Sequence, residues 1–259
     1  MIKKSQSVNK RVSVIIPTFR DDVALKRLLR QLSALDVFEI IIVDGEGRWS
    51  LPAHLSAFKA VQWKAAPRGR GPQIAHGLAC ATGDYLWVVH TDSQLHADSL
   101  QEIAAVLAQP DVSLGMFRLK FNAMPWAYRL FEFFAKIDTP LTSFGDQGFF
   151  FRRTDIDEIW SELCPILTQA LILEDVILRQ ELKSLGRVKK SRLTIGTSPR
   201  RFQQKGLWRT QMRNAVILLR ARFGTPIEQL YYSYYGTHKS ALNTELNISE
   251  LHPSEAINA

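Results

Sequence analysis

Short apolar runs without polar alternation are the feature that most constrains the fold of this chain. Residues 12–16, 38–43 and 85–89 are almost entirely large and apolar, and charged segments with helical spacing lie between them. Strands that are apolar on both faces need cover on both sides, which is the arrangement of a parallel sheet between helical layers. The pattern therefore predicts an α/β fold with a mostly parallel, doubly wound sheet in a three-layer α/β/α arrangement.

Further elements follow from the same periodicity. Helices are expected at 21–35, after the loop 67–72, at 99–108, at 126–136, from Glu174 to Gly186 and at 207–223, and further strands at 60–63, at 116–121 and after Gly148. No linker, repeat or low-complexity segment divides the chain. We therefore expect one domain over residues 11–224, with a nucleotide-binding half at 11–110 and a mixed half at 111–224, and a C-terminal extension at 225–259.

Basic residues are concentrated in one segment. Residues 183–222 hold twelve Lys and Arg and no Asp or Glu, whereas the rest of the chain carries 21 basic and 25 acidic residues. Such a segment is either a solvated face or a surface that meets the phosphates of a nucleotide, a lipid headgroup or a nucleic acid. Its helix at 207–223 carries Arg209, Arg213, Arg220 and Arg222, so a peripheral membrane contact is a further option.

Cysteine content and hydropathy bear on the compartment. The two cysteines, Cys80 and Cys164, form neither a disulfide framework nor a Cys-x-x-Cys pair, which suits a reducing environment. No apolar run reaches the length of about 18 residues that spans a bilayer, and residues 1–10 lack the apolar core of a signal peptide. We therefore expect a cytoplasmic protein, with at most a peripheral contact at the inner face of the membrane.

Polar residues follow three of the predicted strands. Pro17 and Thr18 follow the first strand, Asp44 ends the second, and His90 and Asp92 follow the run at 85–89. Ligands of such sheets bind outside the carboxyl ends of the strands. Mg²⁺ or Mn²⁺ needs only one or two protein carboxylates beside phosphate oxygens, so Asp92 is the predicted metal ligand and a turn or cap role is its alternative.

The roles of the neighbouring strand-end residues are more open. His90 lies on the same side as Asp92 if the extended geometry of the strand persists, where imidazole is a softer ligand, and structural hydrogen bonding is the alternative. Asp44 is expected either to accept hydrogen bonds from a base or ribose or to form a turn. Arg68 and Arg70, set among glycines, either reach phosphate oxygens or belong to an exposed loop.

A general base is expected at the start of a helix. Glu174 and Asp175 follow an apolar stretch, so the helix would hold both carboxylates rigidly. A partly desolvated carboxylate near an acceptor hydroxyl can remove its proton. Carboxylates also favour helix N-termini because of the helix dipole alone, which is the alternative interpretation.

The order of these motifs resembles family 2 glycosyltransferases with the GT-A fold. The similar stretches run from about residue 12 to residue 222 and comprise Val14-Ile15-Ile16-Pro17-Thr18, Ile41-Ile42-Val43-Asp44-Gly45, Gly69-Arg70-Gly71, Gly83-Asp84, His90-Thr91-Asp92-Ser93, Gly145-Asp146-Gln147-Gly148, Glu174-Asp175 and Arg200-Arg201-Phe202-Gln203. Within the family the chain is most similar to a small soluble bacterial subgroup, which has His-x-Asp in place of Asp-x-Asp and a Gly-Asp-Gln-Gly element.

The resemblance implies a nucleotide-sugar donor, a divalent cation and single-displacement transfer with inversion at the anomeric carbon. It implies that the second half binds the acceptor. On matching positions, Pro17, Thr18 and Asp44 would line the nucleoside site, with Arg70 near it. Asp92 would bind the metal and the diphosphate, and Arg201 falls near the element that holds the diphosphate. His90 takes the place of a carboxylate there and would contact ribose, metal or only its neighbours. Asp146 and Gln147 would lie in the acceptor pocket, Asp175 would be the general base, and Glu174 would support the acceptor.

Two departures from the family pattern leave the donor open. The second strand ends in Asp44-Gly45-Glu46-Gly47 rather than Asp-Asp-Gly-Ser, and His90 replaces the first Asp of Asp-x-Asp. The acceptor is an unspecified hydroxyl, and a lipid-linked acceptor is one option. The alternatives are a nucleotidyltransferase acting on a sugar phosphate, which would need a glycine-rich loop after the first strand, and a non-catalytic basic module for nucleic acid or membrane. Nucleic acid is the least expected partner.

Overall fold

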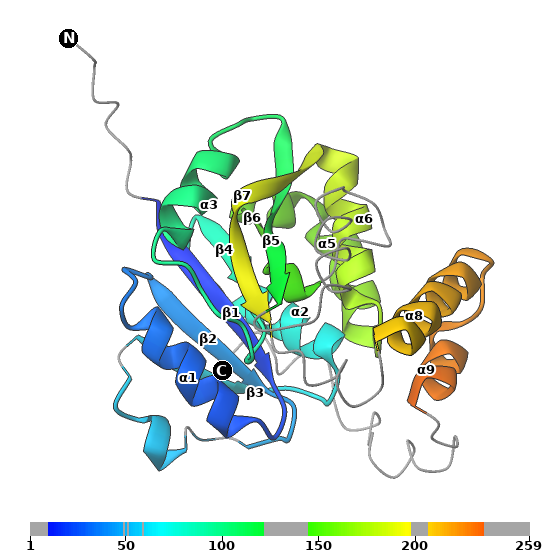
Figure 1. Cartoon of the computed structure of the whole chain (residues 1–259), viewed down its shortest axis with the longest axis horizontal. Helices are drawn as coiled ribbons and strands as arrows, with labels where there is room; N and C mark the ends of the chain where they lie inside the picture. Colours follow the sequence, from blue (N-terminus) through cyan, green and yellow to red (C-terminus); the bar gives the residue numbers. More distant parts are fainter. Residues whose placement is uncertain are drawn as a thin grey trace.

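The computed structural model describes residues 10–48, 50, 52–58, 60–121, 145–197 and 207–235, and Figure 1 shows a twisted sheet with helices on both of its faces. The sheet has seven strands in the order β3-β2-β1-β4-β6-β5-β7. The strands are β1 (Val12–Thr18), β2 (Glu39–Asp44), β3 (Val61–Ala65), β4 (Tyr85–Val88), β5 (Val112–Phe121), β6 (Phe150–Arg152) and β7 (Arg187–Thr197).

One strand runs against all the others. β6 is antiparallel to both β4 and β5, whereas the remaining neighbours pair in parallel. The predicted α/β class with a mostly parallel sheet and a mixed second half is therefore confirmed. The register of β1 on β2 places Thr18 beside Asp44, so the carboxyl ends of these two strands lie side by side.

Helices cover the two faces of the sheet. The helical segments are α1 (Asp22–Leu32), η1 (Ala53–Leu55), α2 (Arg70–Cys80), α3 (Ser99–Leu107), η2 (Gly145–Gln147), α5 (Arg153–Gln169), α6 (Glu174–Leu185), α8 (Leu207–Arg222) and α9 (Ile227–Tyr235). Alternate residues of β1 enter different cores: Val14 and Ile16 pack in the cluster that contains α1 and α3, and Ile15 packs in the cluster that contains α2, α5 and α6. This two-sided burial is why the early strands are continuously apolar.

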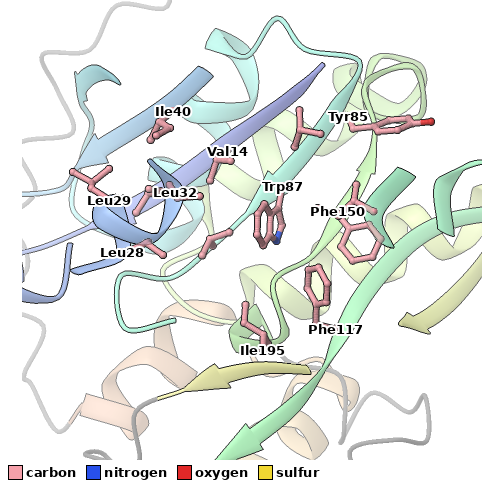
Figure 2. Close-up of a cluster of buried hydrophobic side chains, with 14 of the residues drawn as sticks. Val14, Leu28, Leu29, Leu32, Ile40, Tyr85, Trp87, Phe117, Phe150 and Ile195 are labelled. Carbon is pink, nitrogen blue, oxygen red and sulfur yellow. The ribbon is translucent and has the colours of Figure 1, made fainter. Parts of the chain in front are cut away.

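Aromatic side chains join the parallel strands to the mixed part of the sheet (Figure 2). Trp87 of β4 and Phe117 of β5 have ring centroids 5.6 Å apart, and Phe117 and Phe150 of β6 have centroids 5.1 Å apart. All three side chains are almost completely buried. Tilted aromatic contacts of this kind add stability beyond the burial of area. These contacts hold the strand that leads to His90 and Asp92 in a fixed position against its neighbours.

The basic segment divides into two different elements. Residues 187–197 form β7, an edge strand that carries lysines and arginines, which discourage pairing with another sheet. The last part of the segment forms α8, as predicted. We did not predict β7, α5 or α9, and the helix expected at 126–136 lies outside the described residues. In the described part of the chain, no helix combines the length and hydropathy that crossing a membrane requires.

Candidate active site

A buried glutamine holds the carboxyl ends of the first two strands together. Gln73 of α2 is 3% exposed, and its Nε2 donates to the carbonyl oxygens of Thr18 and Val43, at 2.6 and 2.7 Å. The Gly45 N–H donates to the Thr18 carbonyl oxygen as well, at 2.9 Å. Because buried amide groups are costly without partners, this clamp fixes the relative position of the two strand ends. We did not predict Gln73 from the sequence, where it is an unremarkable polar residue of a helix.

The end of β1 presents a buried hydroxyl without a partner. Pro17 and Thr18 are both buried, and Thr18 Oγ1 has no hydrogen-bond partner among the described residues. Leaving a buried hydroxyl unsatisfied costs about 1–3 kcal/mol, so such a group needs an explanation. A polar ligand that reaches the carboxyl end of β1 would satisfy it.

Asp44 is paired with an arginine that the sequence did not single out. The Asp44 carboxylate is completely buried and accepts from Arg48 Nη2 at 2.9 Å and from the Arg48 backbone N–H at 3.0 Å. The same guanidinium donates two further bonds to Asp22, both at 3.0 Å. Asp22 and Asp44 therefore raise the pKa of the Arg48 guanidinium, and the hydrogen bonds that Arg48 donates to Asp22 are the larger cause. The two groups form one unit at the end of β2.

The segment after β4 is a turn rather than an extension of the strand. β4 ends at Val88, and the Ser93 N–H donates to the His90 carbonyl oxygen at 3.1 Å. The condition for His90 and Asp92 to lie on the same side, an extended backbone, is therefore not met, because the chain forms a turn here. His90 is buried, whereas Asp92 is half-buried at the outer part of the turn.

Asp92 nevertheless suits a divalent cation that is shared with a phosphate ligand. In the described residues, no group of three His, Cys, Asp or Glu side chains is arranged to hold a metal. A cation at Asp92 would thus take most of its ligands from phosphate and water, which is the ordinary binding mode of Mg²⁺. The single half-buried carboxylate fits that mode.

Three polar residues from separate elements converge on Gly145. His90 Nε2 lies 3.8 Å from Asp146 Oδ1, and the Gly145 N–H donates to Asp175 Oδ2 at 2.9 Å. A Cβ added to Gly145 would lie 2.9 Å from His90 Nε2 and 3.4 Å from Asp175 Cβ. Only glycine leaves room for this approach. The structure thus brings together His90, Asp146 and Asp175, which are far apart in the sequence.

Asp175 is held by backbone donors and still retains accepting capacity. Its Oδ1 accepts from the Val176 N–H at 2.8 Å, and its Oδ2 accepts from Gly145. A carboxylate oxygen has two lone pairs, so each oxygen can accept one more bond. Burial raises the pKa of the Asp175 carboxyl, and the Gly145 hydrogen bond partly opposes that shift. A fixed carboxylate with a raised pKa is suited to accept a proton.

Glu174, the residue before Asp175, is buried and forms an ion pair with Arg70, whose side chain is partly exposed. Its Oε1 is 3.5 Å from Arg70 Nη1, and its side chain is only 7% exposed. Desolvation raises the pKa of Glu174 to about 7, although the Arg70 charge lowers it. We expected Arg70 near the nucleoside site, and the structure shows that it links the start of α2 to the start of α6.

The residue before this pair adopts a rare backbone conformation. Leu173 has φ 66° and ψ 20°, the left-handed region that costs an ordinary residue about 1–2 kcal/mol. Non-glycine residues keep such conformations only where the surroundings determine them, and they gather at functional sites. This geometry turns the chain so that α6 begins directly with Glu174 and Asp175.

Gln147 and Asp146, both predicted for the acceptor pocket, differ in their exposure to solvent. Gln147 is completely buried, and its place in the acceptor pocket stays a prediction. Asp146 retains a side chain that is 34% exposed and is the accessible member of the Asp-Gln pair. Arg201 lies outside the described residues.

Together these groups provide two adjoining chemical environments. One, at the ends of β1 and β2, offers an unsatisfied hydroxyl and a buried Asp44–Arg48 unit for polar recognition. The other, around Gly145, offers a desolvated carboxylate, Asp175, beside an accessible one, Asp146. The turn that carries Asp92 begins at His90, which also belongs to the second environment.

The comparisons with known proteins agree on the architecture. Residues 13–176 match the family model described as glycosyl transferase family 2, while no curated protein matches the chain. A mannosyltransferase from Pyrobaculum calidifontis, PcManGT, solved in complex with GDP-Man and Mn²⁺, is similar with a TM-score of 0.64 at 16% identity, over 87% of this chain and 70% of that one.

Two other solved structures are also similar. TarS residues 1–349 from S. aureus give a TM-score of 0.55 at 15% identity, over 92% of this chain and 77% of that one. Glucosyl-3-phosphoglycerate synthase from Mycobacterium tuberculosis, in complex with Mn²⁺, UDP and glucosyl-3-phosphoglycerate, gives 0.52 at 14% identity, over 84% and 81% of the two chains. At identities this low, the structural similarity shows the fold alone, which is GT-A. The family match covers more than half of the sequence, so the chain belongs to glycosyl transferase family 2 and is a glycosyltransferase.

Proposed function

We propose that the protein transfers a sugar from a nucleotide-sugar donor to an acceptor hydroxyl, with inversion at the anomeric carbon and with the help of a divalent cation. The observation that carries this proposal is the convergence of His90, Asp146 and Asp175 around Gly145, at the carboxyl end of β4. It joins a candidate base to the turn that carries the candidate metal ligand. The similar solved structures, which contain GDP-Man or UDP with Mn²⁺, support a donor of this class.

The donor nucleoside is assigned to the ends of β1 and β2. Thr18 Oγ1 is the buried hydroxyl that gains a partner, and Pro17 shapes the adjoining surface. Asp44 takes part through the unit that it forms with Arg48, because its carboxylate already accepts bonds from that residue. The ligand therefore meets a neutralised pair rather than an isolated buried charge.

The diphosphate is assigned to the turn after β4. Asp92 would hold Mn²⁺ or Mg²⁺, which would neutralise negative charge on the diphosphate leaving group. His90 is buried behind Asp92 and contacts Asp146, so its role is to position the turn. Arg201 remains a proposed diphosphate contact from the sequence resemblance.

Asp175 is assigned as the general base. It would accept the acceptor proton as the acceptor oxygen forms a bond with the anomeric carbon, while the bond from that carbon to the diphosphate oxygen breaks with its electron pair. The Gly145 and Val176 N–H groups hold the base in place, the Glu174–Arg70 pair fixes the preceding residue, and Asp146 is the accessible carboxylate for the acceptor. Attack opposite the leaving group inverts the configuration.

Calorimetric binding of UDP and GDP, with and without Mn²⁺, tests the assignment of Asp92. We expect Mn²⁺ to strengthen binding of one of these nucleotides in the native protein. Asp92→Ala should remove that gain, since the cation then loses its protein ligand. Asp98→Ala is the matched control, because Asp98 is an exposed carboxylate six residues later in the same loop. Equal Mn²⁺ dependence in the native protein and Asp92→Ala would exclude Asp92 as the ligand.

A further inference from the structure

The outer face of α8 carries a continuous stripe of exposed apolar side chains. Met212, Val216, Leu219 and Phe223 are 69%, 50%, 54% and 85% exposed. Steps of four, three and four residues place all of them on one side of a helix. Phe223 continues the helical pattern, because its N–H donates to the Leu219 carbonyl oxygen at 3.0 Å. Scattered exposed apolar residues need no explanation, but an aligned stripe does.

The opposite face of α8 already has its partner within the protein. Ile217 is 3% exposed and packs with Ile172 and Leu230, and Leu173 and Ala221 lie against the same cluster. α8 and α9 project together at one side of the molecule, beyond α5 and α6 (Figure 1). The helix is thus anchored on the segment directly before Glu174 and Asp175. Its stripe is therefore not a core face, since the core face is occupied.

The charge of α8 indicates what covers the stripe. Its sequence contains four arginines and no acidic residue. Arg220 is exposed and donates one hydrogen bond to Ser233 Oγ, at 3.1 Å. A guanidinium has five N–H donors, so Arg220 can also donate to a ligand. Arg213 is half-buried. An apolar stripe in a strongly basic helix is typical of a helix that lies in the interface of an anionic bilayer.

We propose that α8 docks the protein onto an anionic lipid surface, with the stripe in the boundary between headgroups and acyl chains and with Arg220 on a lipid phosphate. A second copy fits less well, because a symmetric contact through this face would place the arginines of both copies together. A nucleic acid would use the arginines but would leave the four apolar side chains in water.

Docking also specifies the class of acceptor, a consequence that rests on the proposed function. Ile172 and Leu173 pack against the inner face of α8, so this helix is anchored on the segment that leads into the proposed base. Docking of α8 would bring that part of the protein to the membrane, where a lipid carries the acceptor hydroxyl. The acceptor class is therefore an amphipathic molecule held in the membrane.

Vesicle flotation with the full chain tests the docking surface. We compare vesicles of phosphatidylcholine with vesicles that contain about one third phosphatidylglycerol, and expect binding to the anionic vesicles. Leu219→Gln with Phe223→Gln should weaken the partition about a hundredfold, the loss expected for two buried large apolar side chains. Arg220→Gln should weaken it about fivefold.

Val23→Gln is the matched control, because Val23 is 64% exposed and lies on α1. It should bind vesicles as the native protein does. Native protein that stays unbound, or a stripe variant that binds normally, would overturn the proposal. Light scattering that shows a dimer dissociated by the stripe variant, without vesicle binding, would assign the face to a second copy. Binding of a DNA duplex with unchanged affinity in the stripe variant, and none to vesicles, would assign it to nucleic acid.

These outcomes are separable from the catalytic assignment. Vesicle binding needs no donor, and the stripe residues touch none of the proposed catalytic groups. The stripe variant should keep its binding of a nucleoside diphosphate, which shows that it is folded. Docking without transfer activity would refute the catalytic proposal alone, and transfer without docking would refute the lipid surface alone.

Discussion

Glu174 shows how burial at a single residue couples ionisation to stability. Its pKa rises from an ordinary 4.5 to about 7 in the folded protein. Because the folded state binds this proton more tightly than the unfolded chain, the contribution to stability is complete below pH 4.5 and is lost as the pH rises through about 7. The corresponding change in unfolding free energy is about 3 kcal/mol.

Glu174→Gln should flatten this dependence. The amide has the same shape and no ionisable proton, so the variant should lose less stability than the native protein between about pH 5 and 8. Urea denaturation across that range measures the difference. Glu162→Gln, at an exposed position of α5, serves as the control and should follow the native curve. Parallel curves for native protein and Glu174→Gln would contradict the assigned ionisation.

Single-residue chemistry was only partly predictable from the sequence. Asp44 and Asp175 stand out as carboxylates at a strand end and a helix start. Arg48 and Gln73 do not, because their roles depend on partners that the fold supplies. The pairing of Arg48 with Asp22 crosses 26 positions, and that of Gln73 with Thr18 crosses 55. A local sequence pattern carries no information about contacts between residues so far apart in the chain.

At the scale of elements, the site depends on the close approach of η2 to α6 and to the end of β4. Gly145→Ala would place a methyl group 2.9 Å from His90 Nε2. We expect the turn to shift, with a stability loss of about 1–3 kcal/mol and a loss of transfer activity. Thermal unfolding and a transfer assay measure the two effects.

A second substitution isolates the contact. In a His90→Ala background the clashing ring is absent, so the stability penalty of Gly145→Ala should become smaller. Equal penalties in both backgrounds would show that His90 does not limit the space at Gly145.

Three of the strands that the sequence predicted have the same burial on both faces of the sheet. β1, β2 and β4 are buried on both faces and therefore read as unbroken apolar runs. β7 escaped prediction because it is a half-exposed edge strand rich in basic residues. α5 escaped because Pro165 interrupts its pattern, although the helix continues through that position. The turn after β4 was expected only as an alternative role for Asp92, because an apolar strand that ends in polar residues does not show where the chain reverses.

At the scale of the whole molecule, one sheet joins the proposed donor side to the proposed acceptor side. The antiparallel strand β6 connects β4 with β5, and the aromatic contacts of Trp87, Phe117 and Phe150 tie these strands together. The ion pair between Arg70 and Glu174 forms a second link, from the start of α2 to the start of α6. The proposed donor site and the proposed base are therefore joined through two sets of contacts between packed elements.

The most direct test of the proposed mechanism is the release of nucleoside diphosphate by Asp175→Asn, measured over a panel of nucleotide sugars with Mn²⁺. Turnover should fall about 100-fold or more, the usual contribution of a general base, while nucleoside diphosphate binding stays unchanged. Asp157→Asn, at a carboxylate whose side chain is 62% exposed on α5, should retain native turnover. Native turnover by Asp175→Asn would contradict the assignment of Asp175 as the base.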